Sequence, residues 1–248
     1  EAEANIEVNF DMVLVACLND GDEIVRTKAI EGLWECHEPA LVGTFTTLLQ
    51  NDSSPIVRAA AAKALGIFAL LAEIGKIRPQ YAEQLEASLL RTLEDNTQGM
   101  EIRQRALESV SYFNKAKISE IIKDAYNSVE RPLKISAIRA MGKNLDSNWL
   151  KILLKELSSP EDELRLEAAR ACGETGDEKA VINLIERSED EDPQVQLAAI
   201  QALGQIGGKR ATKALTGMLK HPEEIIRVAA AESLQEAQFL DDPTSISL

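Results

Sequence analysis

The chain has 248 residues, of which 45% are hydrophobic, 27% charged and only 4% aromatic, with 13 Gly and 8 Pro. This composition excludes a disordered tail, a collagen-like fibre and a flexible linker. Alanine and leucine dominate over β-branched and aromatic residues, which disfavours a β-sandwich. The 27 Lys and Arg residues against 41 Asp and Glu residues give a net charge of −14, which disfavours binding to nucleic acid.

Residues 1–10 form an N-terminal segment that opens with Glu-Ala-Glu-Ala and no Met, which indicates a processing scar or the boundary of a longer chain. The helix expected next is apolar around most of its circumference: Phe10, Met12, Val13, Leu14, Val15 and Leu18. We expect a preceding repeat, a partner protein or a second copy of the chain to cover it. The alternative is a self-contained chain whose first helix packs adequately.

From residue 11 to residue 238 one motif recurs. Its anchor residues are Arg26, Arg58, Arg103, Lys134, Arg165, Gln196 and Arg227, spaced by 32, 45, 31, 31, 31 and 31 residues. Val, Ile or Leu precedes every anchor, alanine stands three positions after it, and Leu, Val, Met or Cys stands seven positions after it. Spacings of four residues place these three positions on one stripe of a helix, which we expect to be core. Six positions after each anchor the residue is small, as expected where two helices approach closely.

A second amphipathic segment precedes each anchor, as in residues 150–157, 180–185 and 214–219. Pro or Asp then starts the next helix. Each unit is therefore expected to be a helical hairpin, whose buried aliphatics supply roughly 15 kcal/mol against an ordering cost of about 1–2 kcal/mol per residue. Because one hairpin is too small to fold alone, we predict an all-α protein, an α-solenoid of about seven hairpins over residues 11–238, followed by a polar tail at 239–248.

The anchor motif resembles the HEAT repeat family, in the short form of about 31 residues also found in phycobilisome-lyase-like proteins. The clearest copies lie in residues 52–66 and 192–207. The resemblance implies a ladder in which an Asp before a second helix pairs with the anchor Arg of a neighbouring repeat. Asp20 with Arg26 and Asp52 with Arg58 fit this pattern. Gln196 and the missing Asp before Lys134 depart from it, so we expect gaps in the ladder.

Fourteen extra residues separate the second and third anchors, and they fall within residues 66–93, around Gly75 and Pro79. Both flanking helices stay periodic there. We therefore expect an elongated hairpin between repeats two and three, with each helix longer by about two turns. It either packs only on itself or serves as a docking element that exposes Leu70, Leu71 or Tyr81.

Few residues suited to catalysis are present. His37 and His221 are the only histidines, and the three cysteines form no CxxC pair, so we expect no metal site, no cofactor and no catalytic residue. The pair His37-Glu38 resembles one of the several ligand pairs of HEAT-repeat deoxyhypusine hydroxylases, and we expect it to lie in a solvated loop. Cys172 falls on the core stripe, which indicates a structural thiol.

The cysteine content favours a reduced, cytoplasmic location. The most apolar run, residues 59–72, is interrupted by Lys63, so we expect no membrane-spanning segment.

The second helices have a solvent-facing lane, defined here as the positions two, five and nine residues after each anchor. In the central repeats it carries cations and one aromatic residue against an acidic background. The candidate partner-binding residues are Lys63, Arg105, Tyr112, Arg139, Lys143 and Arg170. Extended or helical partners bind the concave faces of solenoids, so we expect this lane to bind an acidic or phosphorylated protein segment. The alternative is that these charges pair with carboxylates on neighbouring helices.

The leading functional hypothesis is a non-catalytic protein–protein interaction scaffold or adaptor. The resemblance leaves a second hypothesis, a bilin lyase or chromophore-handling protein, and a regulatory domain of a larger protein is a third. A HEAT-like DNA-base-lesion glycosylase or other nucleic-acid binder is disfavoured, because it needs a basic groove with several aromatics.

Overall fold

The computed structural model describes residues 10–144 and 146–241. These residues form fourteen α-helices and two short 3₁₀ helices, with no strand in this part of the chain. They divide into two compact units, one ending at Phe113 and the other beginning at Asn114. The helices of unit 1 are α1 (Asp11–Cys17), α2 (Glu23–Gly32), α3 (Ala40–Asn51), α4 (Pro55–Glu73), α5 (Pro79–Glu94) and α6 (Met100–Val110).

Unit 2 contains eight of the α-helices among the described residues. They are α7 (Ala116–Tyr126), α8 (Arg131–Lys143), α9 (Leu150–Glu156), α10 (Asp162–Thr175), α11 (Val181–Arg187), α12 (Pro193–Ile206), α13 (Gly208–Met218) and α14 (Glu224–Asp241). The 3₁₀ helices Ser147–Trp149 and Glu178–Ala180 directly precede α9 and α11. The all-α fold of stacked helical hairpins expected from the sequence is confirmed within each unit, and the number of seven repeats stays a prediction.

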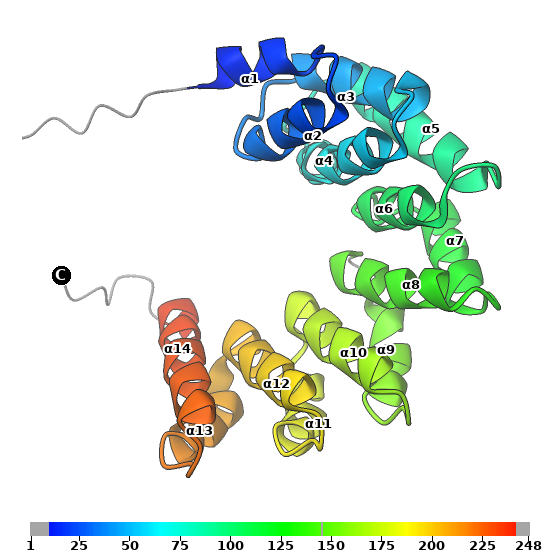
Figure 1. Ribbon diagram of the computed structural model, residues 1–248. Coiled ribbons are helices and arrows are strands. Elements are labelled where there is room, and N and C mark those ends of the chain that lie inside the picture. The colour runs from blue at the N-terminus through cyan, green and yellow to red at the C-terminus, as the bar shows by residue number, and fades with distance from the viewer. Residues whose placement is uncertain (1–9, 145, 242–248) are drawn as a thin grey trace, which may run out of the picture. The chain divides into compact units, whose positions relative to one another are not determined.

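Each unit has two layers of helices (Figure 1). In unit 1, α2, α4 and α6 form one layer, and α1, α3 and α5 form the other. In unit 2, α8, α10, α12 and α14 form one layer, with α7, α9, α11 and α13 behind them. The even-numbered helices carry the anchor residues, so they are the second helices of the hairpins.

The predicted stripe is the core of both units. All seven alanines three positions after the anchors are buried. The aliphatic positions before and after them are also buried, except Val25, which is 36% exposed, and Leu234, which is half-buried. These two exceptions lie in the first and last second helices of the described chain, which have a neighbouring second helix on one side only.

Adjacent second helices approach one another at a glycine eight positions after the anchor. A Cβ atom added to Gly204 would lie 2.8 Å from the Cα of Ser233, and one added to Gly173 would lie 2.9 Å from the Cα of Ala202. Gly142 meets Ala171 in the same way. The small residues six positions after the anchors are therefore small because the preceding second helix packs directly on them.

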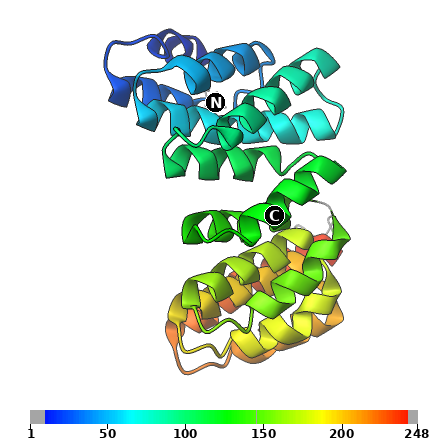
Figure 2. The ribbon, with the colours of Figure 1, turned by 90° about the vertical axis from the view of Figure 1, so that its right-hand side faces the viewer.

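The elongated hairpin predicted between repeats two and three is present as α4 and α5, of 19 and 16 residues. Gly75 closes the turn between them with φ +72°, a left-handed conformation that glycine adopts without steric cost. In Figure 2 this turn lies beyond the ends of α3 and α6. Leu70, Leu71 and Tyr81 are all half-buried, so the hairpin packs largely on its own unit.

The predicted ladder forms in both units. Arg26 Nη2 lies 2.8 Å from Asp52 Oδ1, and Arg165 Nη2 lies 2.8 Å from Asp190 Oδ1. In both pairs the Nε atom contacts the second carboxylate oxygen, while Nη1 donates to a backbone carbonyl in the turn of its own repeat. Each guanidinium thus connects two consecutive repeats.

Two anchor residues make other contacts: Arg58, which the sequence placed in the ladder, and Lys134, where a gap was expected. Arg58 Nε donates to the Gln98 side chain at 3.3 Å, and Lys134 Nζ lies 3.7 Å from Glu156.

Burial raises the pKa of Asp190, but hydrogen bonds from Arg165 and from the Asp192 amide outweigh it, so that the pKa lies below its usual value.

One described helix, α4, is long and apolar enough to cross a membrane by length and composition alone, although the sequence led us to expect none. Eight of its residues are buried, and it packs against α2, α3, α5 and α6. A core helix satisfies the same criterion, so this is weak evidence for a membrane span.

Candidate functional site

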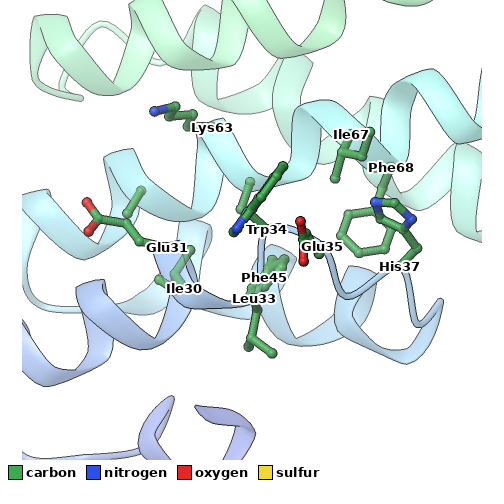
Figure 3. Close-up of a pocket in the computed structure, with 12 residues that line it drawn as sticks. Ile30, Glu31, Leu33, Trp34, Glu35, His37, Phe45, Lys63, Ile67 and Phe68 are labelled. Atoms are coloured by element: carbon green, nitrogen blue, oxygen red, sulfur yellow. The ribbon is translucent and has the colours of Figure 1, made fainter. Parts of the chain in front are cut away.

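Unit 1 contains a cavity of about 800 Å³, which we call the Trp34 cavity (Figure 3). It lies between the end of α2, the turn that follows α2, and α4, with Phe45 of α3 at its base. Its lining residues are Ile30, Glu31, Leu33, Trp34, Glu35, His37, Phe45, Ala60, Lys63, Ala64, Ile67 and Phe68.

The base of the Trp34 cavity is apolar and buried. Phe45 and Phe68 are each 1% exposed, and their rings pack edge to face with centroids 6.0 Å apart. On the α4 side, Ala60 and Ala64 are too small to fill the space above them.

Trp34 stands at the rim and is 70% exposed, which is unusual for the side chain with the largest apolar surface. It lies eight positions after Arg26, where four other repeats have the glycine that contacts the next second helix. An indole is too large for such a close contact between two helices. The helix itself ends at Gly32, so Trp34 and Glu35 lie in the following turn instead of on a continuing helix.

The rim of the Trp34 cavity carries both signs of charge. Glu31, Glu35 and Lys63 are all exposed. Glu31 accepts from Lys28 at 2.7 Å, whereas Glu35 and Lys63 form no ion pair within the described residues. In Figure 3, Glu35 lies on one side of the indole, and Glu31 and Lys63 lie on the other.

The six candidate partner-binding residues fall into two groups, three in each unit. In unit 1, Lys63 lines the Trp34 cavity, and Arg105 on α6 lies 3.2 Å from Glu108 and 3.8 Å from Glu101. Tyr112 lies in the turn just after α6 and is half-buried, with its ring close to Gly66.

In unit 2, the buried carboxylate of Glu167 accepts from two of the candidates. Arg139 Nη2 lies 2.8 Å from Glu167 Oε1, and Arg170 Nη1 lies 3.1 Å from the same oxygen. Lys143, the last residue of α8, is half-buried. The pairing with a neighbouring helix considered as the alternative exists for Arg139 on α8 with Glu167 on α10, whereas Arg170 and Arg105 pair with carboxylates on their own helices. Binding of a partner by these residues stays a prediction.

The lane positions defined from the sequence include Glu31, Glu35, Ala60, Lys63 and Ile67, but Trp34 and the cavity were not predicted. A signal was present, because Trp34 is the one large residue at a position that is Gly, Ser or Gln in the other six repeats.

Residues with potential for metal binding or nucleophilic chemistry are dispersed. The described residues contain no group of three or more His, Cys, Asp or Glu side chains that could hold a metal ion. His37 and Glu38 are both exposed in the turn before α3, as expected. Burial raises the pKa of the Cys172 thiol to about 12, which makes it a poor nucleophile at neutral pH and supports its assignment to the core.

Several solved structures share this fold. The complex of CpcE and CpcF of phycocyanin lyase from Nostoc sp. PCC7120 matches with a TM-score of 0.59 and 17% identity, covering 96% of this chain and 98% of that one. Kap121p bound to Pho4p matches with a TM-score of 0.57 and 16% identity, covering 94% of this chain and 27% of that one. Kap95p bound to RanGDP matches with a TM-score of 0.55 and 16% identity, covering 96% of this chain and 35% of that one.

Among curated proteins, no sequence matches the chain. The family model of HEAT repeats matches residues 12–109 and 150–235, which together make up well over half of the sequence. The chain therefore belongs to the HEAT-repeat family.

Proposed function

We propose that this protein is a non-catalytic interaction scaffold of the cytoplasm that binds a segment of a partner protein on the faces of its second helices. The observation that carries the proposal is the Trp34 cavity, with its apolar base and its exposed indole. Interface energy concentrates in aromatic anchors set beside pockets, and Trp is the residue most enriched among them. HEAT repeats generally serve as protein-interaction scaffolds, which agrees with this reading.

The cationic residues of the lane add a preference for an acidic or phosphorylated segment. The proposed contacts are Lys63, Arg105 and Tyr112 in unit 1, and Arg139, Lys143 and Arg170 in unit 2. Arg105, Arg139 and Arg170 already contact carboxylates, and a phosphate has to compete with Glu108 and Glu167 for them. Lys63 has no such competitor among the described residues, so it is the strongest candidate of the six.

Selection of binders from a displayed library of random peptides tests the scaffold function with the full chain. We expect enriched peptides whose affinity falls at least tenfold in the Trp34→Ala variant, as is typical of an aromatic hot spot. Phe239→Ala is the matched control, because Phe239 is also an exposed aromatic residue but lies on α14 in unit 2. Failure to enrich any peptide that depends on Trp34 would contradict the proposal.

Charge reversal tests the preference for acidic segments. Binding of acidic or phosphorylated peptides is expected to weaken in Lys63→Glu and in the double variant Arg139→Glu, Lys143→Glu. Lys179→Glu is the control, since Lys179 is exposed in the 3₁₀ helix that precedes α11 and lies outside the lane. Unchanged affinity in both reversal variants would refute the preference for acidic segments. Only the apolar contacts of the Trp34 cavity would then remain in the proposal.

The apolar helix α1 is a further proposed contact with another protein. Met12 is 82% exposed, and Phe10 and Val13 are also exposed. An exposed apolar patch of this kind on a folded protein typically marks an interaction site. Replacement of Met12 and Val13 by Ser is expected to weaken partner capture without lowering the unfolding temperature. Unchanged capture would remove α1 from the interface.

Chromophore handling is a second candidate, which the size of the Trp34 cavity favours. About 800 Å³ lies within the range of roughly 300–1,000 Å³ typical of small-molecule sites. A protein of similar fold is part of a phycocyanin lyase. Incubation with a bilin-containing pigment extract, followed by gel filtration, separates the two functions: a retained, red-shifted chromophore supports this candidate, and its loss in Trp34→Ala would place it in the cavity.

A further inference from the structure

We propose that the Trp34 cavity selects an aromatic or leucine-sized side chain whose neighbour in the partner is arginine or lysine, with that cation held between the indole of Trp34 and the carboxylate of Glu35. The inference rests on the proposed function, since it defines the chemistry of the segment that the scaffold binds. It adds a basic residue beside the apolar anchor, and leaves the acidic part of the segment to Lys63.

The apolar part of the partner is indicated by the base of the cavity. Leu33, Phe45 and Phe68 are almost completely buried beneath the cavity, and the half-buried Ala60, Ala64 and Ile67 add hydrocarbon surface that a partner can reach. Water in such a hollow makes few hydrogen bonds, so an apolar side chain that displaces it gains free energy.

The cation is indicated by the groups at the rim. Trp is the aromatic residue that binds cations best through its ring face, and most of the Trp34 side chain is open to solvent. Glu35 follows Trp34 directly in the same turn, is exposed, and has no ion pair among the described residues. Glu31 is already paired with Lys28, so Glu35 is the carboxylate that remains available.

The direction of the segment follows from Lys63. This residue projects from α4 on the side of Trp34 opposite to Glu35 (Figure 3). A partner cation near Lys63 would be repelled, whereas one near Glu35 would be attracted by both the indole and the carboxylate. The overall charge of −14 adds a weak, general attraction for the basic residue.

The probes for the test are three capped dipeptides: N-acetyl-Phe-Arg-amide, N-acetyl-Phe-citrulline-amide and N-acetyl-Phe-Glu-amide. Citrulline has nearly the shape of arginine but no charge, so the first two probes isolate the cation. The readout is the fluorescence of Trp34 in the full chain. Trp149, the other tryptophan, is 4% exposed in unit 2 and donates its Nε1 hydrogen to Asn144, so it supplies a constant background. Trp34→Phe measures that background.

We expect the Phe-Arg probe to shift the Trp34 emission and to bind about threefold more tightly than Phe-citrulline, as for an exposed charge pair. Phe-Glu is expected to bind more weakly than both. Glu35→Gln removes the preference for Phe-Arg, while Glu38→Gln keeps it, because Glu38 is exposed in the same turn but does not line the cavity. Equal binding of Phe-Arg and Phe-citrulline, or a preference that survives Glu35→Gln, overturns the inference.

The peptide library separates this inference from the proposed function. Trp34-dependent binders without a basic residue beside the apolar anchor would refute the inference and leave the scaffold function standing. A complete lack of Trp34-dependent binders would refute the function itself. A blue shift of Trp34 emission with rising protein concentration alone would show that a second copy fills the cavity, which also overturns the inference.

Discussion

Replacement of Arg165 by methionine is expected to be the most damaging single change to the ladder. The Arg165 and Asp190 side chains are 6% and 2% exposed, and two contacts of 2.8 and 2.9 Å join them. Arg165 Nη1 also donates to the Ser159 carbonyl at 3.0 Å. Methionine preserves the packing of the aliphatic part but leaves the Asp190 carboxylate buried without its main partner.

The expected loss is about 3 kcal/mol of unfolding free energy. Breaking a buried ion pair from one side costs about 3–5 kcal/mol, because an uncompensated charge remains. The lower end applies here, since Arg187 Nη1 still lies 3.0 Å from Asp190 Oδ2 and is partly exposed. Double replacement of Arg165 by Met and Asp190 by Leu is expected to recover much of the loss.

Arg131→Met is the matched control. Arg131 also connects consecutive repeats of unit 2, through Glu161 at 2.9 Å and Glu163 at 2.7 Å, but all three side chains are well exposed. Water and salt screen such pairs, so the loss is expected to be much smaller than for Arg165.

Urea unfolding followed by far-UV circular dichroism and by the fluorescence of Trp149 measures both variants. Trp149 is buried and belongs to the same unit as both arginines, so its emission reports local unfolding there. Equal losses for Arg165→Met and Arg131→Met would refute the argument that burial decides the strength of the ladder.

Three further predictions concern pH, packing and thiol chemistry. The pKa of Asp190 is lowered in the folded protein, so its carboxylate stabilises the fold above the unfolded pKa of about 3.9, and this stabilisation is lost as the pH falls through the folded pKa. The acid-induced loss of stability is therefore expected to be smaller in Asp190→Asn, as measured by thermal unfolding between pH 2 and pH 6. Gly204→Ala is expected to lower the unfolding free energy by about 1–3 kcal/mol, because its Cβ would lie 2.8 Å from the Cα of Ser233. Gly217→Ala, whose Cβ would have no atom within 4 Å, is expected to raise it by up to about 1 kcal/mol. Urea unfolding that shows the same sign for both variants would contradict this. Burial raises the pKa of Cys172 to about 12, so its thiol is expected to resist Ellman's reagent at pH 8 in the folded protein and to react after unfolding. Rapid labelling of Cys172 in the folded chain, located by mass spectrometry, would contradict its burial.

The amino-acid sequence determined the helical hairpins and their core. Each anchor is flanked by apolar positions four residues apart, and this spacing depends only on the geometry of a single helix. The resemblance to HEAT repeats also implied a ladder between consecutive repeats, which the structure shows for Arg26 with Asp52 and for Arg165 with Asp190.

The candidate site was only partly predictable. The lane positions were identified as solvent-facing, and Lys63 and Glu35 do lie at the rim of the Trp34 cavity. The pairing of Arg139 on α8 with Glu167 on α10 was left open, because it depends on the distance between two helices and on side-chain rotamers.

The cavity itself was decided by tertiary structure alone. Local sequence does not reveal whether Trp34 lies over a core or over a hollow, since that depends on where α4 passes relative to the end of α2. Periodic burial is a property of one helix and its repeat, so the sequence determined it. The space between two helices, and therefore the surface available to a partner, exists only once those helices have packed.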